Sequence, residues 1–290
     1  MKTLHNTIFT TLIVVISVSA PAYSQANAKV LSAGIGFSDY SQPFQAKIGL
    51  GIGPVSEYEG SGKYGAIALP LVDIRKPGAY FLKGASINTN DGLASAGLTI
   101  FHFSYSKGSD HRLQFEIGPF VRAYGGRDET DSEVLSGLGD IDRSAGIGGF
   151  MEFSAGSWLA YVTMTPQDVG DDKEGNLATF DIEYTTSNKD GLKLSTGLST
   201  SWADDDYMQG YFGVTNAQAT QSRLSRFDSK AGLKDVGFQV KASYTLSPRW
   251  SLEGQAGYWR LLNDAADSPV VKDEGSVDQV RGLVGFSYQF

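Results

Sequence analysis

Segments in which every second residue is apolar recur along this chain, and this pattern constrains its fold more than any other feature. Residues 44–52, FQAKIGLGI, alternate apolar side chains with polar ones or glycine. The same period of two returns in residues 112–117, 177–184, 192–198, 237–246 and 249–258. Turn sequences such as RKPG, SNKDG and LSPR separate the segments. Strand side chains point alternately to the two faces of a sheet, so the pattern predicts an antiparallel all-β fold.

The length of these segments separates two all-β architectures. A soluble β-sandwich buries its apolar face against a second sheet, whereas a transmembrane β-barrel turns that face to lipid. Strands of soluble proteins peak near five or six residues, whereas strands that cross a membrane need about nine to eleven. The segments here are of the longer kind, which predicts a transmembrane antiparallel β-barrel. Aromatic residues near the segment ends are typical of headgroup-level girdles. They are Tyr80, Phe81, Phe103, Tyr105, Trp202, Tyr207, Trp250, Tyr258 and Trp259.

The N-terminus is typical of an export signal. Lys2 provides a positive start, the run IFTTLIVVISVSA is apolar, and small residues follow at SQA and ANA. We therefore expect residues 1–26 to be cleaved and residues 29–290 to form a single barrel domain. The absence of Cys excludes disulfides, and the net charge of −8 argues against a nucleic-acid partner.

The C-terminus, VRGLVGFSYQF, alternates apolar residues up to a final Phe. In a barrel the last strand pairs with the first, and lipid covers its apolar face. An alternating C-terminal strand that ends in Phe is also similar to the signal by which bacterial barrels are recognised by the barrel assembly machinery. The predicted assembly signal consists of Val284, Phe286, Tyr288 and Phe290.

Several longer blocks resemble the MipA/OmpV family, the MltA-interacting proteins of Gram-negative outer membranes. The blocks are SEYEGSGKYGAIALPLVDIR, YFLKG, LSGLGDID, YFGVTNAQATQSRL, AGLKDVGF, YTLSPRW and RLLNDAADSPVV. They occur in the family's order and spread over residues 49–290. Family members often carry Pro in place of Ser56 and Gly in place of Arg223, and both departures fall in expected loops.

The resemblance implies an outer-membrane barrel in contact with lipid and lipopolysaccharide. It further implies a scaffold that brings a murein hydrolase, a lytic transglycosylase, together with a penicillin-binding synthase at the peptidoglycan. The alternative that the family also suggests is a porin-like, osmotically regulated channel for small solutes. We prefer the scaffold as the hypothesis, and we expect no enzyme activity and no cofactor.

The polar face of the strands predicts a charged lumen. A wet lumen suits a channel, and it equally suits a closed barrel whose charges pair across the interior, so both possibilities remain open. The candidates for lining the lumen are Lys47, Arg75, Glu116, Arg122, Glu152, Asp181, Glu183, Lys241 and Glu253, with Asp73 beside them.

Catalytic and metal-binding readings of the sequence are weaker. His102 and Ser104 share one strand face, and Glu116 on the next strand could orient the imidazole, as in a lumenal lipid hydrolase. The alternation turns His102 inward, away from lipid substrates, so we treat this set as a polar lumen wall. The acidic runs GDID, VGDDKEGN and ADDD lack the spacing of a calcium loop, and we expect solvated loops and no metal.

The strand count raises a question of parity. A plain reading gives thirteen strands, including residues 207–214, whereas a bacterial barrel needs an even number. An extra strand near 224–231, turning at GLKD, would give the preferred count of fourteen. That topology would place Asn216, Gln218, Gln221 and Ser222 on the periplasmic side as candidate contacts for a partner. In the competing twelve-strand reading, this region and one neighbouring segment fold as loop or plug.

Overall fold

The computed structural model describes residues 30–35, 43–84, 86–88, 90, 92–106, 112–170, 173–188, 190–273 and 275–290. The predicted signal segment, residues 1–26, lies outside these ranges. The first strands are β1 (Val30–Ile35), β2 (Gln45–Ser56), β3 (Tyr64–Lys76), β4 (Tyr80–Lys83), β5 (Ala94–Leu98), β6 (Phe101–Ser106) and β7 (Arg112–Tyr124). The later strands are β8 (Ser144–Ala155), β9 (Trp158–Asp168), β10 (Glu174–Ser187), β11 (Leu192–Ala203), β12 (Gly232–Thr245), β13 (Trp250–Leu261) and β14 (Asp278–Gln289).

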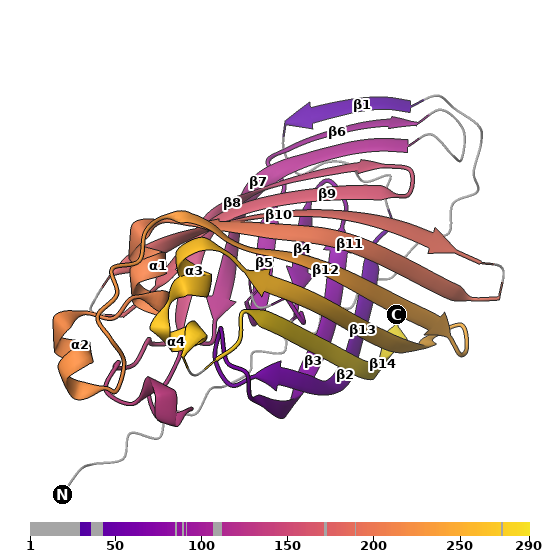
Figure 1. The fold of residues 1–290 in the computed structure, drawn as a ribbon. Coiled ribbons are helices and arrows are strands. Elements are labelled where there is room, and N and C mark those ends of the chain that lie inside the picture. The colour runs from indigo at the N-terminus through magenta and orange to yellow at the C-terminus, as the bar shows by residue number, and fades with distance from the viewer. Residues whose placement is uncertain are drawn as a thin grey trace, which may run out of the picture.

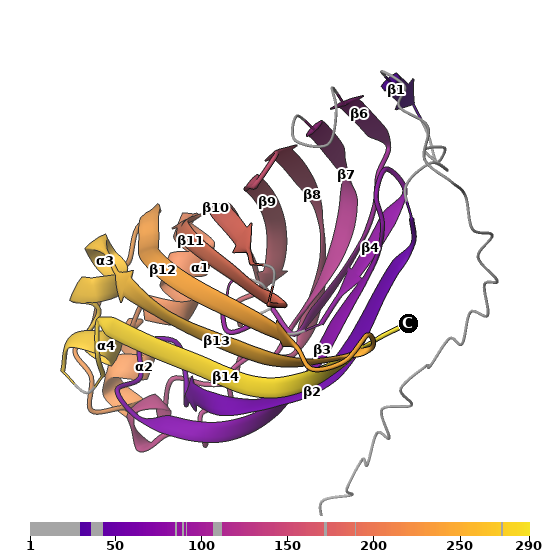
Figure 2. The same cartoon turned by 90° about the vertical axis from the view of Figure 1, so that its right-hand side faces the viewer.

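These strands form a closed antiparallel barrel. Each strand from β7 to β14 pairs with the next along the chain, and β14 pairs with β2 to close the ring. β5 and β6 both pair with β7 and together occupy one place, while β1 pairs only with β6 and lies outside the ring. Figure 2 shows β1 at the outer edge beside β6. In the described part of the chain the ring therefore contains 12 strands.

The ring has an even number of strands because one of the thirteen predicted strands is not a strand. Residues 207–214, predicted as a strand, fall largely in helix α1 (Asp205–Phe212). The extra strand expected near 224–231 is not formed. This stretch is a loop that comes after helix α2 (Asn216–Gln221), and its one strand-like contact is an isolated bridge between Val214 and Phe227. GLKD is not a turn either, since β12 begins there. The barrel itself is confirmed, with the count at the low end of the predicted range.

The two ends of the barrel differ in the length of their connections. Short connections lie at one end, together with the C-terminus, and we call this the turn end; its described residues include 77–79, 156–157, 188, 190–191 and 246–249. The long connections lie at the other end, which carries α1, α2, α3 (Asn263–Asp267) and α4 (Pro269–Lys272). Figure 1 shows the helices gathered at this loop end, away from the C-terminus. In bacterial barrels, short turns face the periplasm and long loops face outward.

The alternation of the sequence appears as apolar residues outside and polar residues inside. Leu50, Leu198 and Phe286 on the outer face are more than half exposed, as expected for side chains that contact lipid. Tyr80, Trp202, Trp250 and Tyr258 also face outward, as the girdle predicts. Three aromatics predicted for the girdles do not belong to them. Phe81 and Trp259 are buried on the inner face of the wall, and Tyr207 is buried in α1.

No helix among the described residues is long and apolar enough to cross a membrane.

Candidate functional site

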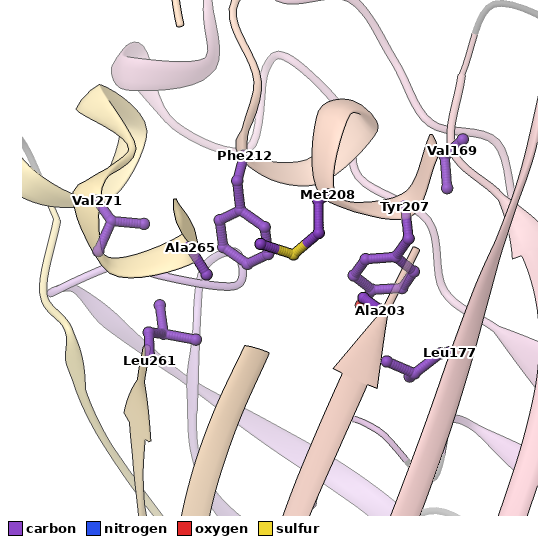
Figure 3. Packing of buried hydrophobic residues seen from close by; sticks show 9 residues of the cluster. All are labelled: Val169, Leu177, Ala203, Tyr207, Met208, Phe212, Leu261, Ala265 and Val271. Carbon is purple, nitrogen blue, oxygen red and sulfur yellow. The ribbon is translucent and has the colours of Figure 1, made fainter. Parts of the chain in front are cut away.

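A compact apolar cluster covers the loop end of the barrel. Helix α1 places Tyr207, Met208 and Phe212 against the strand ends, where Leu177 and Leu261 meet them (Figure 3). The other members of this cluster are Val169, Ala203, Ala265 and Val271. Nearly all of them are less than 5% exposed. An apolar core of this kind outside the wall indicates a packed structure over the loop end, which we call the cap and define as residues 125–143, 204–231, 262–273 and 275–277.

A second cluster ties the remaining parts of the cap together. It joins the connection after β7 to helix α4 and to the chain after α2, and its members are Tyr58, Val134, Leu135, Leu138, Val214, Leu224 and Val270. The hydroxyl of Ser268 donates to the backbone oxygen of Phe212 (2.6 Å), and the amide of Gln218 donates to that of Leu138 (2.6 Å). These contacts join segments that are far apart in sequence, so the cap is built as one unit.

Helix α1 begins at an acidic run that the sequence suggested as a possible cation site. Asp204 caps the helix by accepting a hydrogen bond from the Tyr207 backbone (2.9 Å), and Asp205 accepts one from the Ala231 backbone (2.7 Å). Side-chain oxygens at such positions satisfy the free N–H groups of the first turn. Within the described ranges, no group of His, Asp and Glu side chains is arranged to hold a metal ion.

The phenols of α1 are held neutral by their surroundings. Tyr207 is buried and donates to Glu59 (3.0 Å), and its ring stacks on Tyr211 at 4.7 Å between centroids. Burial raises the pKa of Tyr207 well above its usual value, and the nearby charge of Glu59 raises it further. Burial raises the pKa of Tyr211 in the same direction.

The connection between β4 and β5 enters the barrel, and we call residues 84–93 the inner segment. Residues 84, 86–88, 90, 92 and 93 of it are described. Ile87 is 1% exposed and packs among Leu69, Trp259 and Leu283 on the inner wall. Its backbone oxygen accepts from Arg281 (3.4 Å). The segment therefore occupies lumen space instead of lying over the loop end.

Asn90 of the inner segment links opposite walls of the barrel. Its backbone oxygen accepts from Arg122 of β7 (2.8 Å). Its side chain donates to Asp235 of β12 (3.1 Å) and accepts from Lys234 of the same strand (2.8 Å). All these groups are nearly fully buried. Polar side chains from β7 and β12 are thus joined through one residue that crosses the lumen.

A β-bulge directs two adjacent charges of β12 inward. Ser201 pairs with Asp235 and Trp202 with Leu233, so Lys234 is the extra residue. Both Lys234 and Asp235 are buried, and Lys234 forms ion pairs with Asp235 (2.8 Å) and Glu59. A bulge re-aims side chains in this way because it interrupts the period of two. The polar centre of the lumen is formed by five residues that the alternating pattern does not single out, namely Glu59, Asn90, Lys234, Asp235 and Arg281.

Most of the predicted lumen residues lie nearer the turn end and pair with one another. Lys47 pairs with Glu253 (3.0 Å), and Lys241 pairs with Glu183 (2.7 Å). Arg75 of β3 pairs with Glu152 of β8, two strands that are not neighbours in the ring.

The remaining lumen candidates also lie on the inner face. Glu116 accepts from Thr99 (2.8 Å), and Asp181 stands in register with the buried, inward-facing Ser199. Arg122 reaches the inner segment, as described above. Asp73 is exposed and stands in register with Lys47.

The side chains considered for catalysis lie on the inner wall. His102 stands opposite Glu116 in the β6–β7 register and is 5% exposed. Ser104, two residues further along β6, stands opposite Gln114. His102, Ser104 and Glu116 therefore belong to the polar inner wall of the barrel, as the alternation of apolar and polar residues predicts.

The predicted partner contacts and assembly signal lie at opposite ends. Asn216, Gln218 and Gln221 belong to α2, and Ser222 follows it, all in the cap at the loop end. Their periplasmic placement depended on the extra strand, which is not formed. At the turn end, Val284, Phe286 and Phe290 are more than half exposed on the outer face. The ring of Tyr288 packs between Trp250 and Phe290. The role of this strand as an assembly signal stays a prediction.

Comparisons with known proteins place this barrel in a family. The MltA-interacting protein of Escherichia coli (strain K12) is 21% identical over 267 residues, which cover 89% of this chain and 94% of that protein. The outer membrane protein Omp26La of Vibrio anguillarum is 31% identical over 72 residues, which cover 25% of this chain and 27% of that protein.

Solved structures of outer-membrane proteins share low similarity with the chain. The outer-membrane expressed OmpT of Vibrio cholerae aligns with a TM-score of 0.36 at 11% identity, over 89% of this chain and 100% of that one. The CymD monoaromatic hydrocarbon channel aligns with a TM-score of 0.37 at 11% identity, over 84% and 88%.

The sequence model of the family of MltA-interacting protein MipA matches residues 48–290, nearly all of the described chain. The protein is a β-barrel of the outer membrane. By this match, the chain belongs to the MltA-interacting protein MipA family.

Proposed function

We propose that this protein is a closed, non-enzymatic barrel that holds a partner enzyme of murein metabolism at the periplasmic face of the outer membrane. The observation that carries the proposal is the double closure of the lumen, by the cap at the loop end and by the inner segment below it. A passive pore needs a continuous wet path. Lys234 and Trp259 on the inner wall are at most 2% exposed, which supports a closed interior.

A relative supports the nature of the partner. The Escherichia coli protein that aligns over 89% of this chain is named for interaction with MltA. We infer a lytic transglycosylase of that type as the partner of this chain, with a penicillin-binding protein as a further member of the assembly.

The turn end is the surface that we assign to this contact. By the rule that short turns lie in the periplasm, this end faces the periplasm. Exposed residues there include Asp190, between β10 and β11, and Arg249, between β12 and β13. The ion pairs of Lys47 with Glu253 and Lys241 with Glu183 lie on the inner wall toward this end. Both lysines are more than one-third exposed, so the turn end offers charged groups to a protein partner.

Two measurements test the proposal together. The refolded protein in a planar bilayer should give no stable unitary current steps. The protein purified from solubilised outer membranes should retain a lytic transglycosylase, and the double change Asp190→Arg with Arg249→Glu should reduce that retention.

A matched loop-end variant serves as the control. Arg226 and Asp228 form an exposed ion pair in the cap (2.6 Å). Exchanging them as Arg226→Glu with Asp228→Arg alters a comparable amount of charge and should leave retention unchanged. Stable current steps would overturn the proposal and favour the porin-like channel. Loss of the partner with the loop-end variant alone would overturn the assignment of the contact to the turn end.

A further inference from the structure

The barrel wall is incomplete beside β3. β4 pairs with β3 only from Asp73 to Lys76, and one further hydrogen bond joins the Gly84 amide to the Val72 oxygen (2.8 Å). Beyond this point, the described residues supply no strand to that edge of β3. On the far side, the Leu93 amide bonds to Ala123 of β7 (2.8 Å). Among the described residues, the wall therefore has an opening between residues 64–70 of β3 and residues 92–94, which we call the wall opening.

A proline marks the edge of the wall opening. Alternate residues of an antiparallel strand direct their backbone N–H and C=O to the same side. The Val72 oxygen points to Gly84, so position 70 points to the same side, and Pro70 has no N–H to offer there. Within sheets, proline occurs where its missing N–H is not needed for pairing, as at an edge. The sequence therefore ends strand pairing at this point.

The wall opening lies at the depth of the lipid-facing belt. Pro70 stands in register with Leu50, and Ala68 with Ile52, both on β2. Leu50 is 62% exposed and Ile52 57% exposed, as lipid-facing side chains are. Unpaired backbone groups of a sheet edge cost several kcal/mol in hydrocarbon. An edge at this depth needs a polar or amphiphilic neighbour to cover it.

A cavity of about 340 Å³ lies behind the wall opening. Ile67, Leu69 and Leu93 line it at the two edges, and Tyr207 and Tyr211 of the cap line it from above. Ile67 faces inward yet is 39% exposed, because the opening stands beside it. The volume lies near the lower bound of about 300 Å³ for ligand sites. A cavity of this size admits one apolar chain.

Two buried guanidinium groups line the same cavity and lie at a distance from the nearest carboxylates. Arg127 is 8% exposed and Arg281 3% exposed. Neither forms an ion pair with any carboxylate in the described part of the chain. Their Nε atoms and the Tyr124 hydroxyl are buried without a hydrogen-bond partner there. Burial lowers the pKa of Arg127, and the more distant charge of Asp140 offsets this only in part.

The other contacts of these groups leave room for an anion. Arg127 donates to the Tyr211 backbone oxygen (3.3 Å), and Arg281 stacks on Trp259 at 5.2 Å. Two carboxylates line the cavity, of which Glu59 is bound to Lys234 and Tyr207, while Glu57 is exposed. A buried cation that has no ion pair is costly, so an anionic ligand would be stabilising here.

We propose that this cavity binds a single-chain amphiphile with an anionic head, which enters from the lipid through the wall opening. The carboxylate or phosphate of the head lies among Arg127, Arg281 and Tyr124. The apolar chain lies along Ile67, Leu69 and Leu93 and covers the unpaired edge of β3. This binding is independent of the scaffold role.

Equilibrium binding to the protein in lipid nanodiscs, with empty nanodiscs subtracted, tests the proposal. The probes are a radiolabelled long-chain fatty acid, a lysophosphatidic acid of the same chain length, and the matching fatty alcohol. The two acids distinguish a carboxylate from a phosphate head. At least one acid should bind about tenfold or more tightly than the alcohol, since a hydrogen bond to a charged group contributes roughly 1.5–3 kcal/mol.

Two kinds of variant test the binding of the anionic head and of the apolar chain separately. Arg127→Gln should weaken binding of the acid about tenfold and leave the alcohol unchanged. Ile67→Trp should fill the cavity and abolish binding of all probes, whereas Ile52→Trp, on the outer face of β2, should have no effect. Heat-modifiable mobility in gels verifies folding of each variant.

The outcomes are decisive in both directions. Equal affinity for acids and alcohol, unchanged binding by Ile67→Trp, or equal loss with Ile52→Trp would each overturn the proposal. If Arg127→Gln does not fold, the comparison of acid with alcohol on the wild-type protein and the Ile67→Trp and Ile52→Trp pair still decide it.

Discussion

Lys234 is the most enclosed charge in the described barrel, with no exposed side-chain surface and ion pairs to both Glu59 and Asp235. The residue enters the lumen together with Asp235 because of the β12 bulge. Strict alternation would turn one of the two toward lipid. The sequence does carry a sign of the bulge. Leu233 and Val236 both face outward but are three positions apart instead of two. The prediction of a turn at GLKD, residues 232–235, served the parity of the strand count and overlooked this sign.

Replacing Lys234 by Met tests the role of this charge. The variant K234M keeps a long side chain but leaves Glu59 and Asp235 without their cation. Breaking a buried ion pair by removing one partner costs about 3–5 kcal/mol. We expect the free energy of unfolding to fall by about that amount, measured by urea unfolding of the refolded barrel in lipid vesicles.

The control for K234M is a lysine of an exposed ion pair. Lys272 pairs with Asp267 at 3.5 Å, and both side chains are about two-thirds exposed. Lys272→Met should leave the unfolding midpoint unchanged, because such surface pairs contribute little. Identical midpoints for K234M and the wild-type protein would show that the buried cation does not stabilise the fold.

Helix α1 shows why the cap was harder to predict than the wall. The strand predicted for residues 207–214 is helical over most of its length. The buried side chains are Tyr207, Met208 and Phe212, whose spacing of one and four fits a helix instead. Asp204 is a good N-cap just before this pattern. The helical signal was therefore present, but it is short and follows a long alternating strand.

The phenols of α1 predict that the cap opens in alkali. The pKa of Tyr207 is raised in the folded cap by burial and by Glu59. A raised folded pKa means that the stabilisation is fully present below pH ~10, the ordinary pKa of tyrosine. It is lost as the pH rises from there toward the folded pKa, because only the opened cap releases the proton.

Cysteine labelling measures this opening. Met208→Cys places a thiol at a position with no exposed surface, and Asn216→Cys places one on the exposed face of α2. The ratio of their maleimide reaction rates removes the ionisation of the thiol itself. This ratio should rise above pH ~10 and should rise less when Tyr207 and Tyr211 are both changed to Phe. A ratio that stays constant with pH would argue against the role of the phenols.

At the scale of the whole molecule, the wall follows from local pattern and the interior does not. Alternation, segment length and turn sequences each act within a few residues, and they predicted the barrel and most of its strands. The pair of Arg75 and Glu152 joins β3 to β8 across the lumen, and Asn90 joins β7 to β12. Such contacts depend on how the ring closes and on an inner segment with no period of its own. A polar face in sequence is therefore compatible with an open or a closed lumen.

Closure of the ring gives a prediction for the last residue. β14 pairs with β2 only from Val284 with Ile52 to Gln289 with Lys47. The Phe290 amide adds a bond to the Ala46 oxygen (3.1 Å). If Phe290 also belongs to an assembly signal, its deletion should lower the amount of heat-modifiable barrel in the outer membrane far more than Phe238→Ala, a change at an outward mid-strand ring.

Refolding of the purified protein separates recognition from stability. Deleting Phe290 removes one hydrogen bond at the seam, worth about 1 kcal/mol, together with an exposed ring, so refolding into detergent micelles should remain close to that of Phe238→Ala. A deficit seen in cells and not in micelles assigns Phe290 to recognition by the assembly machinery. A deficit of equal size in both assigns it to closure of the β14–β2 seam. Equal yields of the two variants in cells would remove the terminal residue from either role.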